Sequence, residues 1–166
     1  MEQCLATHEC ICEAISPDNL QEVADMQERW CAERNCKQDP HLCDEYRAIR
    51  EVLDNFWALS AFGAAIRADG TIQAYTIGEA LNPSTAVIHF EKAMSSITGL
   101  YQFVNQAFCR NYLKRFEYVN REQDLGIPGL RKAKMSYHPD RMVEKYTVRF
   151  AAETGLPSAA PSRGDR

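Results

Sequence analysis

The sequence predicts a mixed α/β fold of the α+β kind, with helices on both faces of one sheet. Two apolar stripes of helical period follow a short first strand. The period then changes to two around Asp69-Gly70, which is a strong two-residue hairpin signal. Further on, helices connect the remaining strands. A meander gives antiparallel strands and helical connections permit parallel ones, so the order β-α-α-β-β-β-α-β-α-β predicts a mixed sheet.

The first strand is predicted in "CICEAI", residues 10–15, and is followed by two helices. We expect the first helix to start with Ser16 as its N-cap and Pro17 at the first helical position. Its apolar residues share one arc: Leu20, Val23, Ala24, Trp30 and Cys31. A second helix is expected after Pro40, with a clearer stripe: Leu42, Tyr46, Ile49, Leu53 and Phe56.

Three strands are expected in residues 63–93, with turns at Asp69-Gly70 and Asn82-Pro83. In the last of them, regular alternation would place Ile88 and Phe90 on one face and His89 and Glu91 on the other. A helix over 100–116, a strand over 117–122, a helix over 127–137 and a last strand over 142–150 complete the order. We therefore predict one domain over residues 1–150. Residues 151–166 are rich in small residues and proline, which predicts a disordered tail.

Charge is distributed unevenly along the 166 residues, whose net charge is −4. Residues 1–57 contain thirteen acidic and five basic side chains, whereas residues 110–149 contain ten basic and five acidic ones. This asymmetry indicates that the C-terminal part faces an anionic ligand. Complementary charge within one fold is the alternative, and charge alone does not separate the two.

The sequence carries no signal of export or of a membrane span. The charge-free stretch near "ALSAFGAAI" is far below the roughly 18 residues that cross a bilayer, so we expect a cytoplasmic protein. The seven cysteines are then expected to be reduced thiols. Cys31, Cys36, His41 and Cys43 are possible zinc ligands, but their spacing is loose for a zinc site and we expect no metal.

Four segments give the chain a specific resemblance. They are "AYTIGEALN", "VIHFEKA", "GLYQFVNQAF" and "YVNREQDLGIPGLRKAKMSYHPDRMVEKY". Together they resemble the family named for the C-terminal domain of phosphatidylglycerol lysyltransferase, from about Ser16 to Val148, and the element order resembles the GNAT acyltransferase fold. The resemblance implies a domain that transfers an acyl or aminoacyl group to an amine or hydroxyl acceptor. The family's namesake transfers lysine from lysyl-tRNA to a membrane lipid.

The resemblance also sets expectations for donor and partners. A typical acetyl-CoA-binding GNAT has a glycine-rich turn before the helix that follows the fourth strand. Here the turn reads "EKAMSSITGLYQ", with Gly99 as its only glycine. This favours aminoacyl-tRNA over acyl-CoA as the donor, with no tightly bound cofactor. Members of the family usually carry a second GNAT-like half, so we expect either such a half or a homodimer as a partner.

Candidate reactive side chains lie at the ends of the fourth and fifth strands. In the GNAT-like architecture these strands diverge, and we expect Glu91 and Glu122 to face one shared gap beside Tyr137. The two carboxylates are the candidate bases, and Tyr137 is the candidate acid for the leaving group. The substrate-binding candidates are Lys92, Gly99, Gln102, Asn105, Asn120, Arg121, Asp124, Arg131 and Lys134.

Each assignment has a structural alternative that stays open at this point. The carboxylates could simply balance Arg121 or Lys92, and Tyr137 could pack in the core with its helix. Arg131, Lys134 and His138 form a basic stripe on the same predicted helix, and this stripe could be a solvated face. If the stripe is functional, it would bind the 3′ end of a tRNA or a nucleotide, while a small molecule or peptide supplies the amine. Two rival functions follow: an acyl-CoA N-acyltransferase with a degenerate pyrophosphate turn, and a non-catalytic module that binds RNA or protein.

Overall fold

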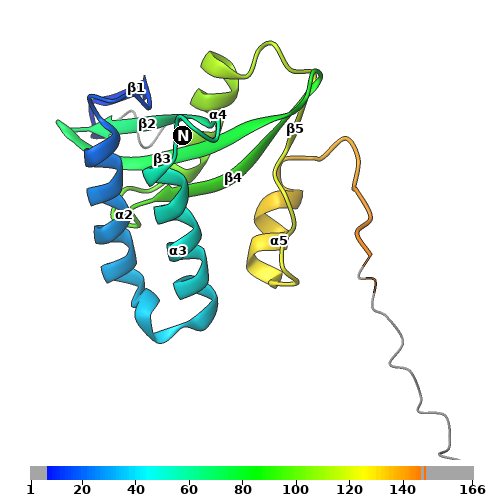
Figure 1. Ribbon diagram of the computed structural model, residues 1–166, viewed down its shortest axis with the longest axis horizontal. Helices are drawn as coiled ribbons and strands as arrows, with labels where there is room; N and C mark the ends of the chain where they lie inside the picture. The colour runs from blue at the N-terminus through cyan, green and yellow to red at the C-terminus, as the bar shows by residue number, and fades with distance from the viewer. Residues whose placement is uncertain (1–6, 147, 149–166) are drawn as a thin grey trace, which may run out of the picture.

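The computed structural model describes residues 7–146 and 148, which are built around one five-stranded sheet (Figure 1). The strands lie in the order β1-β2-β3-β4-β5. The first four pair antiparallel, and β5 runs parallel to β4. The strands are β1 (Cys10–Ala14), β2 (Phe62–Ala68), β3 (Thr71–Asn82), β4 (Thr85–Ala93) and β5 (Tyr118–Asn120). The predicted mixed sheet is confirmed.

Helices cover both faces of this sheet, as predicted. One face packs against α2 (Leu20–Arg34) and α3 (Pro40–Asp54), which the short 3₁₀ helix η1 (Cys36–Gln38) connects. The other face packs against α4 (Leu100–Tyr112). The last helix, α5 (Pro128–Met135), lies beyond β5 and buries none of its residues (Figure 1).

The two first helices differ in how they begin. Asp39 caps α3, because its carboxylate accepts hydrogen bonds from the backbone N–H groups of His41 and Leu42. The expected N-cap at Ser16 of the preceding helix is wrong. Helix α2 begins at Leu20, because the side chain of Asn19 accepts a hydrogen bond from the Ser16 amide and closes residues 16–19 into a turn instead.

Strand β4 departs from the regular alternation expected of it. Ile88 pairs with Gly78, but the next pair joins Phe90 to Ile77, so β4 has one extra residue at His89. As a result Ile88 packs beneath α4, whereas Phe90 packs on the side of α2 and α3. The expectation that both residues share a face is therefore wrong. Beyond this bulge, Glu91 lies on the α4 side.

Two further boundaries differ at the C-terminal end. Strand β5 has three residues where six were expected, because it forms ladder pairs only with Thr85–Val87. Residues 142–146 and 148, expected in a last strand, lie outside any regular element, and the rest of that segment and the expected tail fall outside the described residues. Within the described part of the chain, no helix combines the length and the apolar character that crossing a bilayer requires.

The close approach of β3 and β4 at Gly78 can be tested by substitution. A Cβ added to Gly78 would lie 2.2 Å from the carbonyl oxygen of Val87, so the backbone would have to move. We expect Gly78→Ala to lower the free energy of unfolding by about 2 kcal/mol or more, measured by urea denaturation. Gly129→Ala in α5 is the matched control. It meets no atom within 4 Å and should raise stability by about 0.5 kcal/mol. Equal effects of the two changes would contradict the proposed strand geometry.

Candidate active site

The candidate site lies where β4 and β5 part. The parallel pairing extends from Thr85 opposite Tyr118 to Val87 opposite Asn120. Strand β4 continues for six more residues to Ala93, while the other chain turns away after Asn120. The side chain of Arg121, the first residue past β5, extends into this divergence and reaches Glu91. The expected separation of the two strands is present, and an arginine fills it.

Glu91 is a buried carboxylate with partners on both oxygens. Its side chain is 11% exposed. Arg121 Nη2 lies 2.8 Å from Oε1, and Asn105 Nδ2 on α4 donates to Oε2 over 2.9 Å. Burial raises the pKa of Glu91, because removal from water penalises the charged form by more than Arg121, Asn105 and Lys134 stabilise it. A carboxylate with a raised pKa is a stronger base than an ordinary exposed one.

Arg121 connects Glu91 to the segment beyond β5. Its guanidinium carbon lies 4.2 Å from the centre of the Tyr137 ring, which is a cation–π geometry. Lys134 Nζ donates to the backbone oxygens of Arg121 and Gln123 over 2.5 and 2.6 Å. Burial, with the nearby Arg121 charge, lowers the pKa of Lys134. Five predicted residues, Glu91, Asn105, Arg121, Lys134 and Tyr137, thus meet in one cluster.

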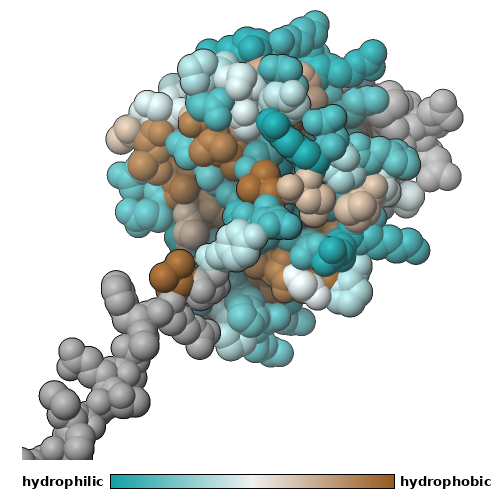
Figure 2. All heavy atoms as spheres, turned by 90° about the vertical axis from the view of Figure 1, so that its right-hand side faces the viewer, coloured by the Kyte–Doolittle hydropathy of each residue, from teal (hydrophilic) through white to brown (hydrophobic). Residues whose placement is uncertain are grey.

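Tyr137 lies at the surface of this cluster and not in a core. Its side chain is 40% exposed, and Leu130 is exposed to a similar extent. Figure 2 looks onto the side of the molecule that carries α5 and shows apolar side chains interspersed with hydrophilic ones. The alternative in which Tyr137 packs in the core through its helix is therefore wrong.

Glu122 belongs to a different group of side chains. Its carboxylate lies 2.8 Å from Nδ1 of His89, and Nε2 of that imidazole lies 3.1 Å from Glu79. Asn120 accepts a hydrogen bond from the Glu122 amide, and Glu122 has a left-handed backbone with φ of 55°. The shared gap expected for the two glutamates is not formed: Glu91 lies beneath α4 and Glu122 lies on the surface.

The remaining candidates flank the cluster. Asp124 accepts from the Gly126 amide and lies 3.7 Å from the exposed Arg131. Gly99 takes a left-handed conformation as the N-cap of α4, and Gln102 lies one turn before Asn105 on that helix. None of these residues touches Glu91 in any contact observed among the described residues.

Lys92 lies on the opposite face of the sheet from Glu91. Its ammonium lies 2.7 Å from Glu45 on α3 and 4.2 Å from the centre of the Trp30 ring on α2. The side chain is 8% exposed, and burial lowers its pKa. Neighbouring strand residues point to opposite faces, and α2 and α3 cover the second face, so Lys92 and Glu91 are separated by the sheet.

Sequence reasoning missed Thr76, which pairs with Glu91 across β3 and β4. Its side chain is fully buried, and no hydrogen-bond partner for its hydroxyl exists within the described residues. Thr76 lies on the α4 face, since its partner in β2, Ala64, packs against Phe108 there. A threonine in a strand is ordinary, so only the strand register could have drawn attention to it.

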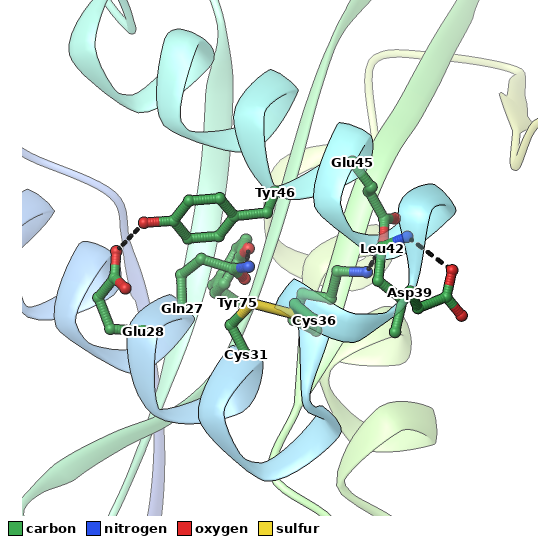
Figure 3. Close-up of a disulfide and its surroundings, with 10 residues drawn as sticks. Gln27, Glu28, Cys31, Cys36, Asp39, Leu42, Glu45, Tyr46 and Tyr75 are labelled. Carbon is green, nitrogen blue, oxygen red and sulfur yellow. Dashed lines mark hydrogen bonds and ion pairs between the residues drawn. A yellow bond between two sulfur atoms is a disulfide. The ribbon is translucent and has the colours of Figure 1, made fainter.

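The cysteines differ from the expected reduced thiols. Cys31 on α2 and Cys36 in η1 form a disulfide (Figure 3). Two of the four possible zinc ligands are therefore bonded to each other, and no group of three potential metal ligands occurs in the part of the chain that is described. Cys43 remains a free thiol and lines, with the disulfide, a pocket of about 340 Å³. A second pocket, of about 240 Å³, lies between Phe62, Trp57 and Arg115.

Comparison with known proteins was decisive for the family and the fold. Residues 6–149 match the family described as "Phosphatidylglycerol lysyltransferase, C-terminal". No curated protein matches the sequence. A solved protein of unknown function from Bacteroides thetaiotaomicron is 39% identical with a TM-score of 0.81, covering 85% of this chain and 48% of its own. The present chain thus spans about half the length of that relative.

Two structures with lower identity show the fold alone. The ribosomal-protein-alanine N-acetyltransferase from Brucella melitensis biovar Abortus 2308 is 12% identical with a TM-score of 0.60, covering 86% of this chain and 100% of its own. The aminoglycoside N-acetyltransferase AAC(6′)-Iy, in complex with a bisubstrate analogue of coenzyme A and acetylneamine, is 11% identical with a TM-score of 0.56, covering 87% and 99%. The fold is that of the GNAT acetyltransferases. The family match spans nearly every described residue and agrees with this fold, so the chain belongs to the phosphatidylglycerol lysyltransferase C-terminal family.

Proposed function

We propose that this chain transfers an aminoacyl group from aminoacyl-tRNA to an amine acceptor, with Glu91 as the base. The observation that carries the proposal is the buried Glu91 carboxylate at the divergence of β4 and β5, in a chain of this family. Its raised pKa makes it a stronger base than an ordinary carboxylate, suited to take a proton from the acceptor nitrogen. We assign the role of acid for the leaving group to Tyr137, which lies exposed beside Arg121.

The proposed step balances atoms and charge. The acceptor nitrogen attacks the carbonyl carbon of the ester, and Glu91 takes a proton from that nitrogen. The bond between the carbonyl carbon and the ribose oxygen then breaks, and the Tyr137 hydroxyl gives its proton to the leaving oxygen. Solvent returns the proton from Glu91 to Tyr137, so the products are an amide and a free ribose hydroxyl. Backbone N–H groups near the divergence would stabilise the oxyanion.

The turn before α4 supports a donor other than acyl-CoA. Gly99 is its only glycine, and the amide of Leu100 already donates to the Ile97 oxygen. The hydroxyl of Ser95 donates to Glu33, which places a carboxylate beside this turn. A negative charge there disfavours a pyrophosphate at the helix N-terminus. The bisubstrate analogue bound to AAC(6′)-Iy favours the rival, an acyl-CoA transferase.

A transfer assay separates these functions. The chain is incubated with a mixture of tRNAs charged with labelled amino acids, or with labelled acyl-CoAs, and with a panel of small amines and peptides. We expect label to move from tRNA to an amine. Label moving only from acyl-CoA, with micromolar binding of coenzyme A by calorimetry, would establish the rival. Failure with every donor would leave a non-catalytic module that binds RNA or protein.

The protonation state of Glu91 predicts a pH dependence. A base is active when deprotonated, and burial holds the pKa of Glu91 above the ordinary carboxyl value of about 4.3. The acidic limb of the kcat/KM profile should therefore lie above that value, because Arg121 and Lys134, the charged groups facing Glu91, offset burial only in part. Glu91→Gln should remove this limb and lower kcat about 10²-fold or more. Glu122→Gln, on the exposed carboxylate, is the matched control and should keep the limb.

The variant Tyr137→Phe tests whether Tyr137 is the acid that protonates the leaving group. The change keeps the ring over Arg121 and removes the hydroxyl, so the cation–π contact persists. We expect kcat to fall roughly 10²-fold while the melting temperature stays within about a degree of the unmodified protein. An unchanged kcat would assign Tyr137 only to holding Arg121.

A further inference from the structure

Arg121 occupies the position beside Glu91 that the proposed acceptor needs. Its Nη2 donates to Oε1, and Asn105 takes Oε2, so both carboxylate oxygens are engaged. A base in the proposed reaction must instead face the acceptor nitrogen. An ammonium or guanidinium of the acceptor would present the same N–H groups that Arg121 presents now.

We propose that Glu91 and Asn105 form a subsite for a cationic N–H donor, which Arg121 fills as an internal plug until the acceptor's ammonium or guanidinium displaces it. The inference rests on the proposed function for the identity of that ligand. The subsite itself can be tested without any acyl donor.

Arg121 is an incomplete occupant of this subsite. Its Nη1 is buried, yet the described residues provide no hydrogen-bond acceptor for it. The hydroxyl of Thr76, the residue paired with Glu91 across β3 and β4, is also buried and has no hydrogen-bond partner among the residues that the structure describes. A buried donor left unpaired costs about 1–3 kcal/mol, more when it is charged. Arg121 Nη1 and the Thr76 hydroxyl therefore both have unused hydrogen-bonding capacity beside Glu91. A ligand that forms these hydrogen bonds would be favoured over Arg121.

The attachment of Arg121 to the rest of the fold is suited to such exchange. Strand β5 ends one residue before it, and α5 has no buried residue. Glu122 and Leu125 take left-handed backbone conformations with φ of 55° and 53°. Lys134 ties the oxygens of Arg121 and Gln123 to α5, so the plug and α5 are joined to each other by hydrogen bonds.

Tyr137 covers the plug from outside. Its ring lies over the guanidinium at 4.2 Å and remains 40% exposed. When the plug leaves, Tyr137 loses its cation and an acceptor cation of similar shape can take its place under the ring.

Chemical complementation tests the subsite. In Arg121→Ala, millimolar methylguanidinium should raise the melting temperature by about 3 °C, whereas tetramethylammonium, which has no N–H group, should not. Unmodified protein and Arg115→Ala, a matched control that removes a surface arginine stacked on Phe116, should show no such rise. The double variant Arg121→Ala with Glu91→Gln should lose the response.

Three results would overturn the proposal: no selective rise in Arg121→Ala, an equal rise with tetramethylammonium, or an equal rise in Arg115→Ala. If Arg121→Ala does not fold, Tyr137→Ala is the second variant, since it removes only an exposed side chain. Methylguanidinium should then shift the Arg121 Nε–H resonance of labelled protein, and an unmoved resonance would overturn the plug. Neither readout requires turnover. Aminoacyl transfer without a methylguanidinium-induced rise in melting temperature would therefore refute only the role of Arg121 as a plug. Such a rise without aminoacyl transfer would refute only the proposed function.

Discussion

The site depends on one irregularity, the bulge in β4 opposite Gly78. Strand β4 alternates regularly up to Ile88. If this alternation continued beyond Ile88, Glu91 would face α2 and α3. The extra residue at His89 reverses the facing, so Glu91 comes to lie beneath α4 within reach of Asn105. The strand register, set by the close approach of Gly78 to Val87, therefore decides which helix the carboxylate meets.

Local signals predicted most of the fold. The hairpin at Asp69-Gly70 and the apolar stripe of α3 depend on neighbouring residues, and both are present. The bulge at His89 and the short β5 depend on pairing between distant segments, which the sequence does not display. The same limit applies to the site. Glu91 and Arg121 were predicted together from the family resemblance, whereas only the register shows that Thr76 joins them.

A buried ion pair such as Glu91–Arg121 adds little to stability, because the loss of hydration offsets most of the attraction. Well-packed apolar residues would hold β4 and α4 together at least as well. A guanidinium lies there with one nitrogen that has no acceptor in the described part of the chain, which is better explained by a role in binding or catalysis than by a role in folding. The pair also links the rigid sheet to the exposed α5, so changes in either can reach the other.

Glu91 and Lys92 are adjacent, oppositely charged and buried on opposite faces of β4. Each has its counter-ion on its own face of the sheet: Arg121 pairs with Glu91, and Glu45 pairs with Lys92. A slip of β4 by one residue would turn every side chain to the other face, placing Glu91 against Glu45 in one direction of slip or Lys92 against Arg121 in the other. The two charges thus penalise misaligned sheets during folding, and they do so at the point where β4 loses the support of β5.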